Sequence, residues 1–194
     1  VLTGEAADEI LFGYDVFKEI KLLEKWKANR DGNTINEIIK ELYPHLLHYS
    51  NPKKQGFIKM YYESFLDSID NDLVGLNIRV ANNSVIQNFF NKDYAINNNK
   101  QNLIDRVKET LPENWNRWSL LQKNQFLEMK TLLQGYLLSS QGDRMSMAHS
   151  VEGRYPFLDH NLVEELFYYE DDYKLNGFSQ KHILRDAFKG EIPD

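Results

Sequence analysis

The chain has 194 residues, 42% of them hydrophobic, and a net charge of −6 that comes from 23 basic and 29 acidic residues. That length suits one domain that buries roughly 70% of its unfolded surface, and the acidic balance argues against a nucleic-acid partner, which needs a basic face. The sequence contains no cysteine, which excludes disulfides, a thiolate nucleophile and a cysteine-based zinc site within these residues.

The apolar runs indicate where in the cell the protein is located, and the two ends of the sequence indicate whether the chain is a complete protein. No apolar run approaches the roughly 20 residues that span a bilayer, so we expect no membrane partner and a cytoplasmic location. The sequence begins at Val1 without a methionine and stops at Asp194 just after a helical pattern. We therefore expect the chain to be a piece of a longer protein.

Helical periodicity dominates the first half of the chain. From 7 to about 27, apolar residues recur at every third or fourth position, which predicts an amphipathic helix with a bend at Gly13. A Thr-x-x-Glu capping box predicts a second helix over 34–47. A third helix is predicted over 55–69, whereas 73–83 is ambiguous between a loop and a short strand.

The second half is also mainly helical in pattern. Its longest periodic run covers 115–139, and Pro112 predicts the end of a preceding helix. Residues 151–156 are predicted to be non-helical, and only residues 1–3 are typical of the end of a strand. Further helices are predicted over 143–149, 162–169 and 179–189. As it stands, the chain is predicted to be mostly α.

The first candidate for chemistry is the segment VLTGEAADE, residues 1–9. A buried strand ends, Gly4 lets the backbone turn, and a helix begins with acidic residues in its first turn. Ligands of open α/β sheets gather beyond the carboxyl ends of strands, and a carboxylate there can hold magnesium that bridges to phosphate. In the alternative, which local spacing alone favours, Asp8 and Glu9 only complement the dipole of the helix.

The second candidate is the segment GDRMSMAHSVEGRYPFLDH, residues 142–160. Arg144, Glu152 and Arg154 stand among apolar residues, so we expect them to be partly buried, which is costly for a charge unless it is paired or binds a ligand. Arginines can bind phosphate or carboxylate with a fork of two N–H groups, but a structural arginine–carboxylate pair is an equally good interpretation. His149 is expected to be structural, because no second histidine lies at metal-ligand spacing.

Three segments carry a resemblance to a known family. TGEAADE followed by Gly13-Tyr14 resembles the SGEGxDE…GGY signature of the asparagine synthase (glutamine-hydrolysing) family, and residues 143–159 resemble its DRxSMAxxxExRxPFLD signature. KHILR, residues 181–185, is similar to a K-x-x-L-R run near the end of the same synthetase domain. The three segments occur in the right order, whereas residues 18–115 carry no matching motif.

The resemblance implies a fold and an activity. Residues 1–194 would be part of a synthetase domain with a doubly wound α/β fold, of the adenine nucleotide alpha hydrolase type, with only its last strand present. With ATP and magnesium as cofactors, the full-length protein would adenylate a carboxylate, aspartate or one like it. Ammonia from glutamine, released by a glutaminase domain elsewhere in the protein, would then give asparagine, AMP and pyrophosphate. Two alternatives are a related amidotransferase with a sugar acid, peptide or metabolite as acceptor, and a non-catalytic helical scaffold.

The resemblance also implies roles for residues of the first segment. Glu5 matches a carboxylate that takes a proton from attacking ammonia, which is useful because ammonia loses a proton as the amide forms. Asp8 matches a carboxylate that binds magnesium and so helps to neutralise the pyrophosphate leaving group. Gly4 belongs to the turn that binds the nucleotide or pyrophosphate.

In the second segment, Arg144 matches a basic position that contacts phosphate and stabilises charge on the leaving oxygens. Glu152 and Arg154 match positions that line the same site, and we assign them to binding or orienting the acceptor substrate.

Some family features are missing from these residues. The SGGxDS loop that cradles the phosphates of ATP does not occur, nor does the cysteine nucleophile of the glutaminase domain, so we expect the 194 residues alone to be inactive. Ala6 stands where the family usually has glycine, and at a positive φ this alanine would cost about 1 kcal/mol. Phe12 likewise replaces a residue that is usually glycine or alanine.

Overall fold

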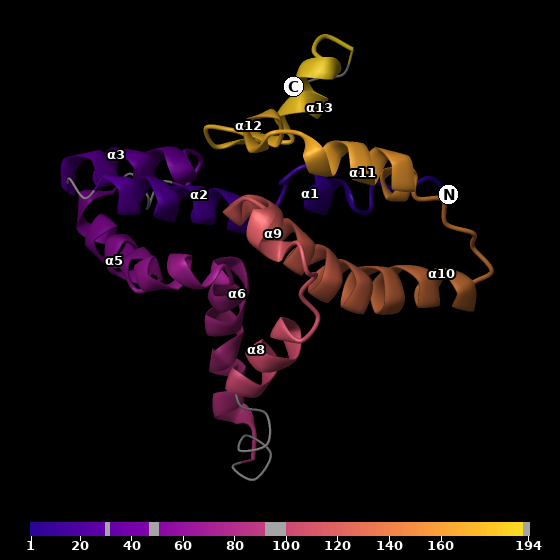
Figure 1. Ribbon diagram of the computed structural model, residues 1–194, viewed down its shortest axis with the longest axis horizontal. Coiled ribbons are helices and arrows are strands. Elements are labelled where there is room, and N and C mark those ends of the chain that lie inside the picture. The colour runs from indigo at the N-terminus through magenta and orange to yellow at the C-terminus, as the bar shows by residue number, and fades with distance from the viewer. Residues whose placement is uncertain (30–31, 47–50, 92–99, 192–194) are drawn as a thin grey trace.

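The computed structural model describes residues 1–29, 32–46, 51–91 and 100–191, and this part of the chain is mostly helical (Figure 1), as predicted. In chain order its elements are α1 (Ala7–Ile10), α2 (Asp15–Ala28), α3 (Gly32–Leu42), α5 (Pro52–Glu63), η1 (Leu66–Asn71), α6 (Val74–Ser84), η2 (Val85–Phe89), α8 (Lys100–Lys108), η3 (Trp115–Arg117), α9 (Leu120–Glu128), η4 (Met129–Asp143), α10 (Arg144–Ala148), η5 (Pro156–Leu158), α11 (His160–Tyr168), α12 (Asp171–Lys174), β1 (Leu175–Asn176), β2 (Ser179–Gln180) and α13 (His182–Ala187).

Extended structure is sparse in the described residues. The predicted strand end at residues 1–3 is limited to one parallel bridge between Leu2 and Arg154, and it is not buried, because Val1 and Leu2 are 75% and 76% exposed. The two named strands, β1 and β2, form an antiparallel hairpin that turns at Gly177, whose φ is +60°. The first residues of the helix predicted over 179–189 therefore belong to this hairpin and not to a helix. The backbone must reverse at the glycine before α13 can begin.

The first predicted helix is broken rather than bent. α1 ends at Ile10 and α2 begins at Asp15. Between them Phe12 adopts a φ of +53°, which interrupts any helix. Its side chain is wholly buried and stacks on Phe17 with 4.7 Å between ring centroids. Burial of this large ring offsets the backbone strain, so the turn is stable although the residue is not glycine.

Two other segments of the first half also differ from their predictions. The ambiguous segment 73–83 forms α6, and Gly75 lies so close to α9 that its N–H donates to Asn124 Oδ1 at 2.9 Å. Packing against α9 therefore stabilises a helix in a segment whose local sequence pattern does not specify its secondary structure. The helix predicted over 34–47 forms as α3, but it begins earlier, at Gly32, so Thr34 lies within it and not at its cap. It also ends earlier, at Leu42, and residue 47 lies outside the described residues.

The long periodic run from 115 to 139 divides into three parts. A short 3-10 turn, η3, precedes α9, which begins with a capping box between Ser119 and Gln122. α9 then continues into η4, a π-helix, and η4 into α10 (Figure 1). π-Helices are rare and often mark functional sites. No helix in the described parts of the chain is both long enough and apolar enough to cross a membrane.

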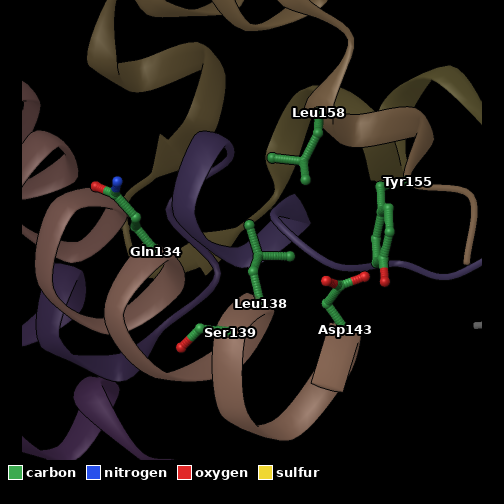
Figure 2. A pocket seen from close by; sticks show the side chains of 6 residues that line it. All are labelled: Gln134, Leu138, Ser139, Asp143, Tyr155 and Leu158. Atoms are coloured by element: carbon green, nitrogen blue, oxygen red, sulfur yellow. The ribbon is translucent and has the colours of Figure 1, made fainter. Parts of the chain in front are cut away.

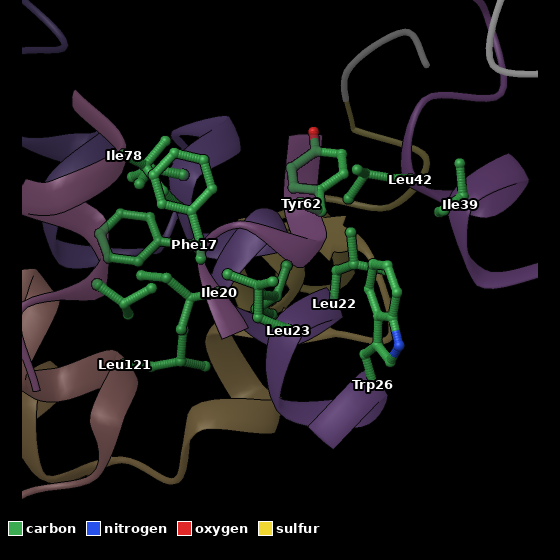
Figure 3. Packing of buried hydrophobic residues seen from close by; sticks show 14 of the residues in the cluster. Phe17, Ile20, Leu22, Leu23, Trp26, Ile39, Leu42, Tyr62, Ile78 and Leu121 are labelled. Carbon is green, nitrogen blue, oxygen red and sulfur yellow. The ribbon is translucent and has the colours of Figure 1, made fainter. Parts of the chain in front are cut away.

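The main core surrounds α2 (Figure 3). Its buried side chains come mainly from α2, α3, α5, α6 and α9, and those that the figure labels are Phe17, Ile20, Leu22, Leu23, Trp26, Ile39, Leu42, Tyr62, Ile78 and Leu121. A smaller cluster joins Ile10 and Leu11 at the end of α1 to Leu166 of α11, with Ile183 and Leu184 of α13 packed against it. This second cluster holds the first sequence motif in place.

A buried lysine connects the hairpin region to α1. Lys174 is wholly buried, with Nζ 3.4 Å from Gln125 Oε1 and 4.4 Å from the centroid of the Phe12 ring. The amide of Gln125 in turn donates to the carbonyl of Ile10 at 3.0 Å. Burial lowers the pKa of Lys174 to about 8. These contacts tie the end of α1 to α9 and α12 through polar groups that the core encloses.

Candidate active site

The first motif and the π-helix η4 enclose a pocket of about 450 Å³. Three of the predicted site residues, Gly4, Glu5 and Asp8, line it together. The complete lining consists of Gly4, Glu5, Ala6, Asp8, Glu9, Tyr14, Leu137 and Gln141. The carboxylates of α1 and the preceding turn therefore face a cavity large enough for a small substrate.

The turn before α1 depends on a left-handed residue. Ala6 has a φ of +74° and lies at the N-cap of α1, and the N–H of Ala7 donates back to the carbonyl of Gly4 at 3.2 Å. The N–H of Glu5 donates to Thr3 Oγ1 at 3.4 Å. A glycine is the residue that adopts this conformation without strain, so the expected strain at Ala6 is present.

Ala6→Gly and Ala7→Gly form a matched pair of variants that measures this strain. Both alanines are buried, so each change removes one buried methyl group and adds the same freedom to the unfolded chain. Only the change at position 6 also relieves a positive φ. We expect Ala7→Gly to lower the free energy of unfolding by about 1 kcal/mol more than Ala6→Gly, as measured by urea denaturation. Equal losses in the two variants would contradict strain at Ala6.

Glu9 is buried beside the pocket and not merely a charge at the start of a helix. Its side chain accepts a hydrogen bond from the hydroxyl of Tyr14 at 3.0 Å, and the residue is 1% exposed. Burial raises the pKa of Glu9 above its usual value. Burial and the neighbouring Glu9 carboxylate raise the pKa of Tyr14 well above its usual value of 10. Tyr14 therefore stays a neutral hydrogen-bond donor.

An ion pair lies behind this hydrogen bond. Arg79 of α6 donates through Nε and Nη2 to the two oxygens of Glu128 of α9, each at 2.6 Å. The guanidinium also lies 5.4 Å from the centroid of the Tyr14 ring. Burial raises the pKa of Glu128, although Arg79 acts in the opposite direction. The pair thus joins two helices beneath the tyrosine that lines the pocket.

The charged residues of the second motif lie on the surface. The expectation that Arg144, Glu152 and Arg154 are partly buried is wrong, because all three are exposed. Arg154 pairs with Glu152 at 2.6 Å, with side chains that are 70% and 74% exposed, and such a pair contributes little to stability. Arg144 forms no ion pair with any described residue, and none of the three lines the pocket of Glu5 and Asp8.

The backbone nevertheless brings the two motifs together. The N–H of Thr3 donates to the carbonyl of Arg154 at 3.0 Å, and the N–H of Arg154 donates to the carbonyl of Val1 at 2.8 Å. The segment that contains Arg154 therefore runs alongside the residues that lead into the pocket. The order of the motifs in the sequence does not reveal this proximity.

Other residues of the second motif line a separate cavity of about 320 Å³ (Figure 2). Asp143 lies at the end of the π-helix, and Tyr155 and Leu158 approach from the far end of the motif. Gln134, Leu138 and Ser139 complete the lining. The second motif therefore faces η4 through Tyr155 and Leu158, while its arginines line neither cavity.

Comparison with known proteins decides the family. The family model described as asparagine synthase matches residues 1–194, which is the whole of the chain. The chain belongs to the asparagine synthase family. Similar curated proteins include the amidases chyE of Penicillium rubens and chry2 of Gibberella zeae, each 28% identical over 211 residues. The glutamine-hydrolyzing asparagine synthetase 1 of Bacillus subtilis is 27% identical over 195 residues.

These relatives are much longer than the chain. Each alignment covers 100% of the chain but only 30% of either amidase and 28% of the Bacillus synthetase. The chain thus spans less than a third of the length of the curated relatives that it matches. No solved structure matches it significantly.

The pocket of this asparagine synthase family member fits magnesium only in part. Glu5, Asp8 and Glu9 supply carboxylate oxygens, which magnesium prefers. However, no three acidic or histidine residues in the described part of the chain are grouped closely enough to hold a metal by themselves. Magnesium commonly binds through one or two carboxylates and the phosphates of a substrate, and the pocket fits that arrangement.

Sequence reasoning assigned no role to several residues around the pocket. Tyr14 belongs to a matched motif, and so does Lys181, whose ammonium lies 2.9 Å from Asp8 Oδ1. Their membership in the family signatures is the only feature of the sequence that indicates a place near the site. Arg79 and Glu128 carry no signal, because they belong to no motif and meet only through the packing of α6 on α9.

Proposed function

We propose that the protein to which this chain belongs is an ATP-dependent amide ligase of the asparagine synthase type. It adenylates the side chain of aspartate and transfers ammonia from glutamine to it, giving asparagine, AMP and pyrophosphate. The observation that carries this proposal is the shared pocket of Gly4, Glu5 and Asp8, the three residues of the first motif to which the family assigns roles. A glutaminase domain elsewhere in the protein supplies the ammonia, and the enzyme acts in the cytoplasm.

The chain contributes part of a doubly wound α/β synthetase domain, and its residues have separate tasks. Glu5 accepts the proton that ammonia loses as its nitrogen bonds to the acyl carbon and the bond from that carbon to the oxygen of AMP breaks. Asp8 would hold the magnesium ion, and Gly4 belongs to the adjoining turn that would bind the phosphates. Magnesium, when bound, neutralises charge on the pyrophosphate leaving group.

The second motif serves the substrates at the edge of the same site. Arg144 contacts phosphate, which is consistent with an exposed guanidinium that no described carboxylate occupies. Glu152 and Arg154 orient the acceptor. Their mutual ion pair is exposed, so it can be exchanged for contacts with a charged substrate at little cost.

A second candidate keeps the adenylation and changes the acceptor to a sugar acid, a peptide or another metabolite. The two relatives named as amidases, each 28% identical to the chain, lend this candidate weak support. A non-catalytic scaffold is the third candidate. The retention of Glu5 and Asp8 in one pocket argues against it.

Exchange of labelled pyrophosphate into ATP by the full-length protein separates these candidates. We expect exchange that depends on both magnesium and aspartate, because a reversible adenylation returns pyrophosphate to ATP only when the acceptor is present. Exchange with another carboxylate and not with aspartate would favour the second candidate. Absence of exchange with every carboxylate tested, from a folded full-length protein, would overturn the ligase assignment and favour the scaffold.

A further inference from the structure

Asp8 already has a cation beside it. Lys181 Nζ lies 2.9 Å from Asp8 Oδ1, with side chains that are 28% and 38% exposed respectively. No other described residue forms an ion pair with Asp8. The one carboxylate that the proposed function assigns to magnesium is therefore paired with an ammonium from near the opposite end of the chain.

The backbone around Lys181 is fixed against the turn that follows α1. The N–H of Lys181 donates to the carbonyl of Leu11 at 3.1 Å, and the amide of Gln180 donates to the carbonyl of Gly13 at 2.6 Å. Lys181 also has a φ of +52°, a conformation that side-chain-bearing residues rarely adopt. The end of the hairpin is thus held in a strained shape that aims the lysine at Asp8.

Gly13 provides the space in which the two side chains meet. A Cβ at this position would overlap both Asp8 Oδ1 and Lys181 Cε, so only glycine is compatible with the pair. The N–H of Gly13 donates to the carbonyl of Asp8 at 2.7 Å, which keeps the turn closed over the pair. The backbone hydrogen bonds of Lys181 and Gly13, together with the missing Cβ of Gly13, therefore place the ammonium of Lys181 next to the carboxylate of Asp8.

We propose that Lys181 is a displaceable counter-ion of Asp8, and that it and a divalent cation exclude each other at this carboxylate. An ammonium and a metal ion require the same oxygen lone pairs, and their positive charges repel each other at that distance. Binding of the metal releases the lysine side chain to solvent. Lys181 thereby lowers the affinity of the unloaded site for metal. This inference rests on the proposed function, in which Asp8 is the magnesium ligand.

The test measures binding of Mn²⁺ alone to the full-length protein, from the signal of free Mn²⁺ in electron paramagnetic resonance. We expect Lys181→Met to tighten Mn²⁺ binding about tenfold, because it frees Asp8 and removes one positive charge. Lys189→Met, which changes the net charge equally at an exposed lysine of the same region, should leave binding unchanged. Asp8→Asn should abolish the site.

The outcomes separate this inference from the proposed function. If Asp8→Asn removes the site and Lys181→Met binds Mn²⁺ no more tightly than Lys189→Met does, the counter-ion role is wrong and the metal role of Asp8 stands. If Asp8→Asn leaves Mn²⁺ binding intact, both the counter-ion role and the metal assignment fail, whereas pyrophosphate exchange still reports on the ligase activity.

A second measurement on the unmodified protein applies if Lys181→Met does not fold. Acetic anhydride reacts with free amines, and mass spectrometry of peptides gives the rate at each lysine. At constant ionic strength, saturating Mn²⁺ should raise the rate at Lys181 toward that of Lys189, because the metal releases the ammonium from Asp8. An unchanged rate at Lys181 would overturn the proposal.

Discussion

Replacement of Glu5 by glutamine in the full-length protein is expected to slow amide formation by about 10²- to 10⁴-fold, the usual contribution of a general base. Pyrophosphate exchange should stay close to the unmodified rate, because adenylation precedes the attack of ammonia and needs no proton transfer to Glu5. Glutamine keeps the size of the side chain and its place in the pocket, so the change removes basicity and little else.

Both rates can be measured in one preparation, as formation of the amide product and as exchange of label between pyrophosphate and ATP. Glu109→Gln, at an exposed glutamate outside the pocket, makes the same chemical change and should affect neither rate. Equal loss of both activities in Glu5→Gln would mean that Glu5 binds substrate or metal and is not a base.

Removal of the guanidinium from the Arg79–Glu128 pair should lower the free energy of unfolding more than any other substitution proposed for this chain. In Arg79→Met, Glu128 remains with a side chain that is only 4% exposed and has lost both of its hydrogen bonds. A buried charge left without its partner costs about 3–5 kcal/mol of unfolding free energy at neutral pH. Urea denaturation measures this loss.

The loss should depend on pH in a defined direction. Burial raises the pKa of Glu128 above 4.5 even with Arg79 present, and without Arg79 the pKa rises further. The folded state then binds more protons than the unfolded state above pH 4.5, so the stability of Arg79→Met falls as the pH rises through this window. The deficit relative to the unmodified protein should therefore be smaller near pH 5 than at pH 7.

Two further variants control this measurement. Arg79→Met combined with Glu128→Leu removes both charges and should recover most of the loss, because the buried charge is gone. Lys40→Met breaks a pair with Glu37 in which both partners are exposed, and should cost less than about 1 kcal/mol. If Arg79→Met costs no more than Lys40→Met, the buried pair does not stabilise the fold.

The first motif could be located from the sequence because its residues are contiguous. A turn and a short helix fix the relative positions of Gly4, Glu5 and Asp8, so a match to a local signature also brings these residues to one pocket. The second motif was harder to interpret. Apolar neighbours favour burial of Arg144 and Arg154, but Met145, Met147 and Val151 are themselves exposed, so an apolar setting in the sequence does not bury these arginines.

The features that sequence reasoning missed depend on contacts between distant segments. The apolar spacing through Phe12 continues without interruption, and only the burial of its ring against Phe17 stabilises the left-handed backbone there. α6 becomes a helix because Gly75 can pack closely on Asn124. Arg79 and Glu128 belong to two different helices, and no local sequence pattern predicts that these helices pack against each other. Hydrophobic periodicity specifies a helix, but it does not specify which helix will be its neighbour.

The bridge between Leu2 and Arg154 bears on the order in which the molecule folds. The contacts between α2 and α3 join residues that are close in sequence, and such contacts form early because little chain entropy is lost in closing short loops. The entry to the pocket instead requires segments from opposite ends of the chain to meet, so it assembles last. For the same reason it opens first when the fold loosens. The Thr3 amide, which donates across this bridge, should then exchange its hydrogen with solvent sooner than amides in α2.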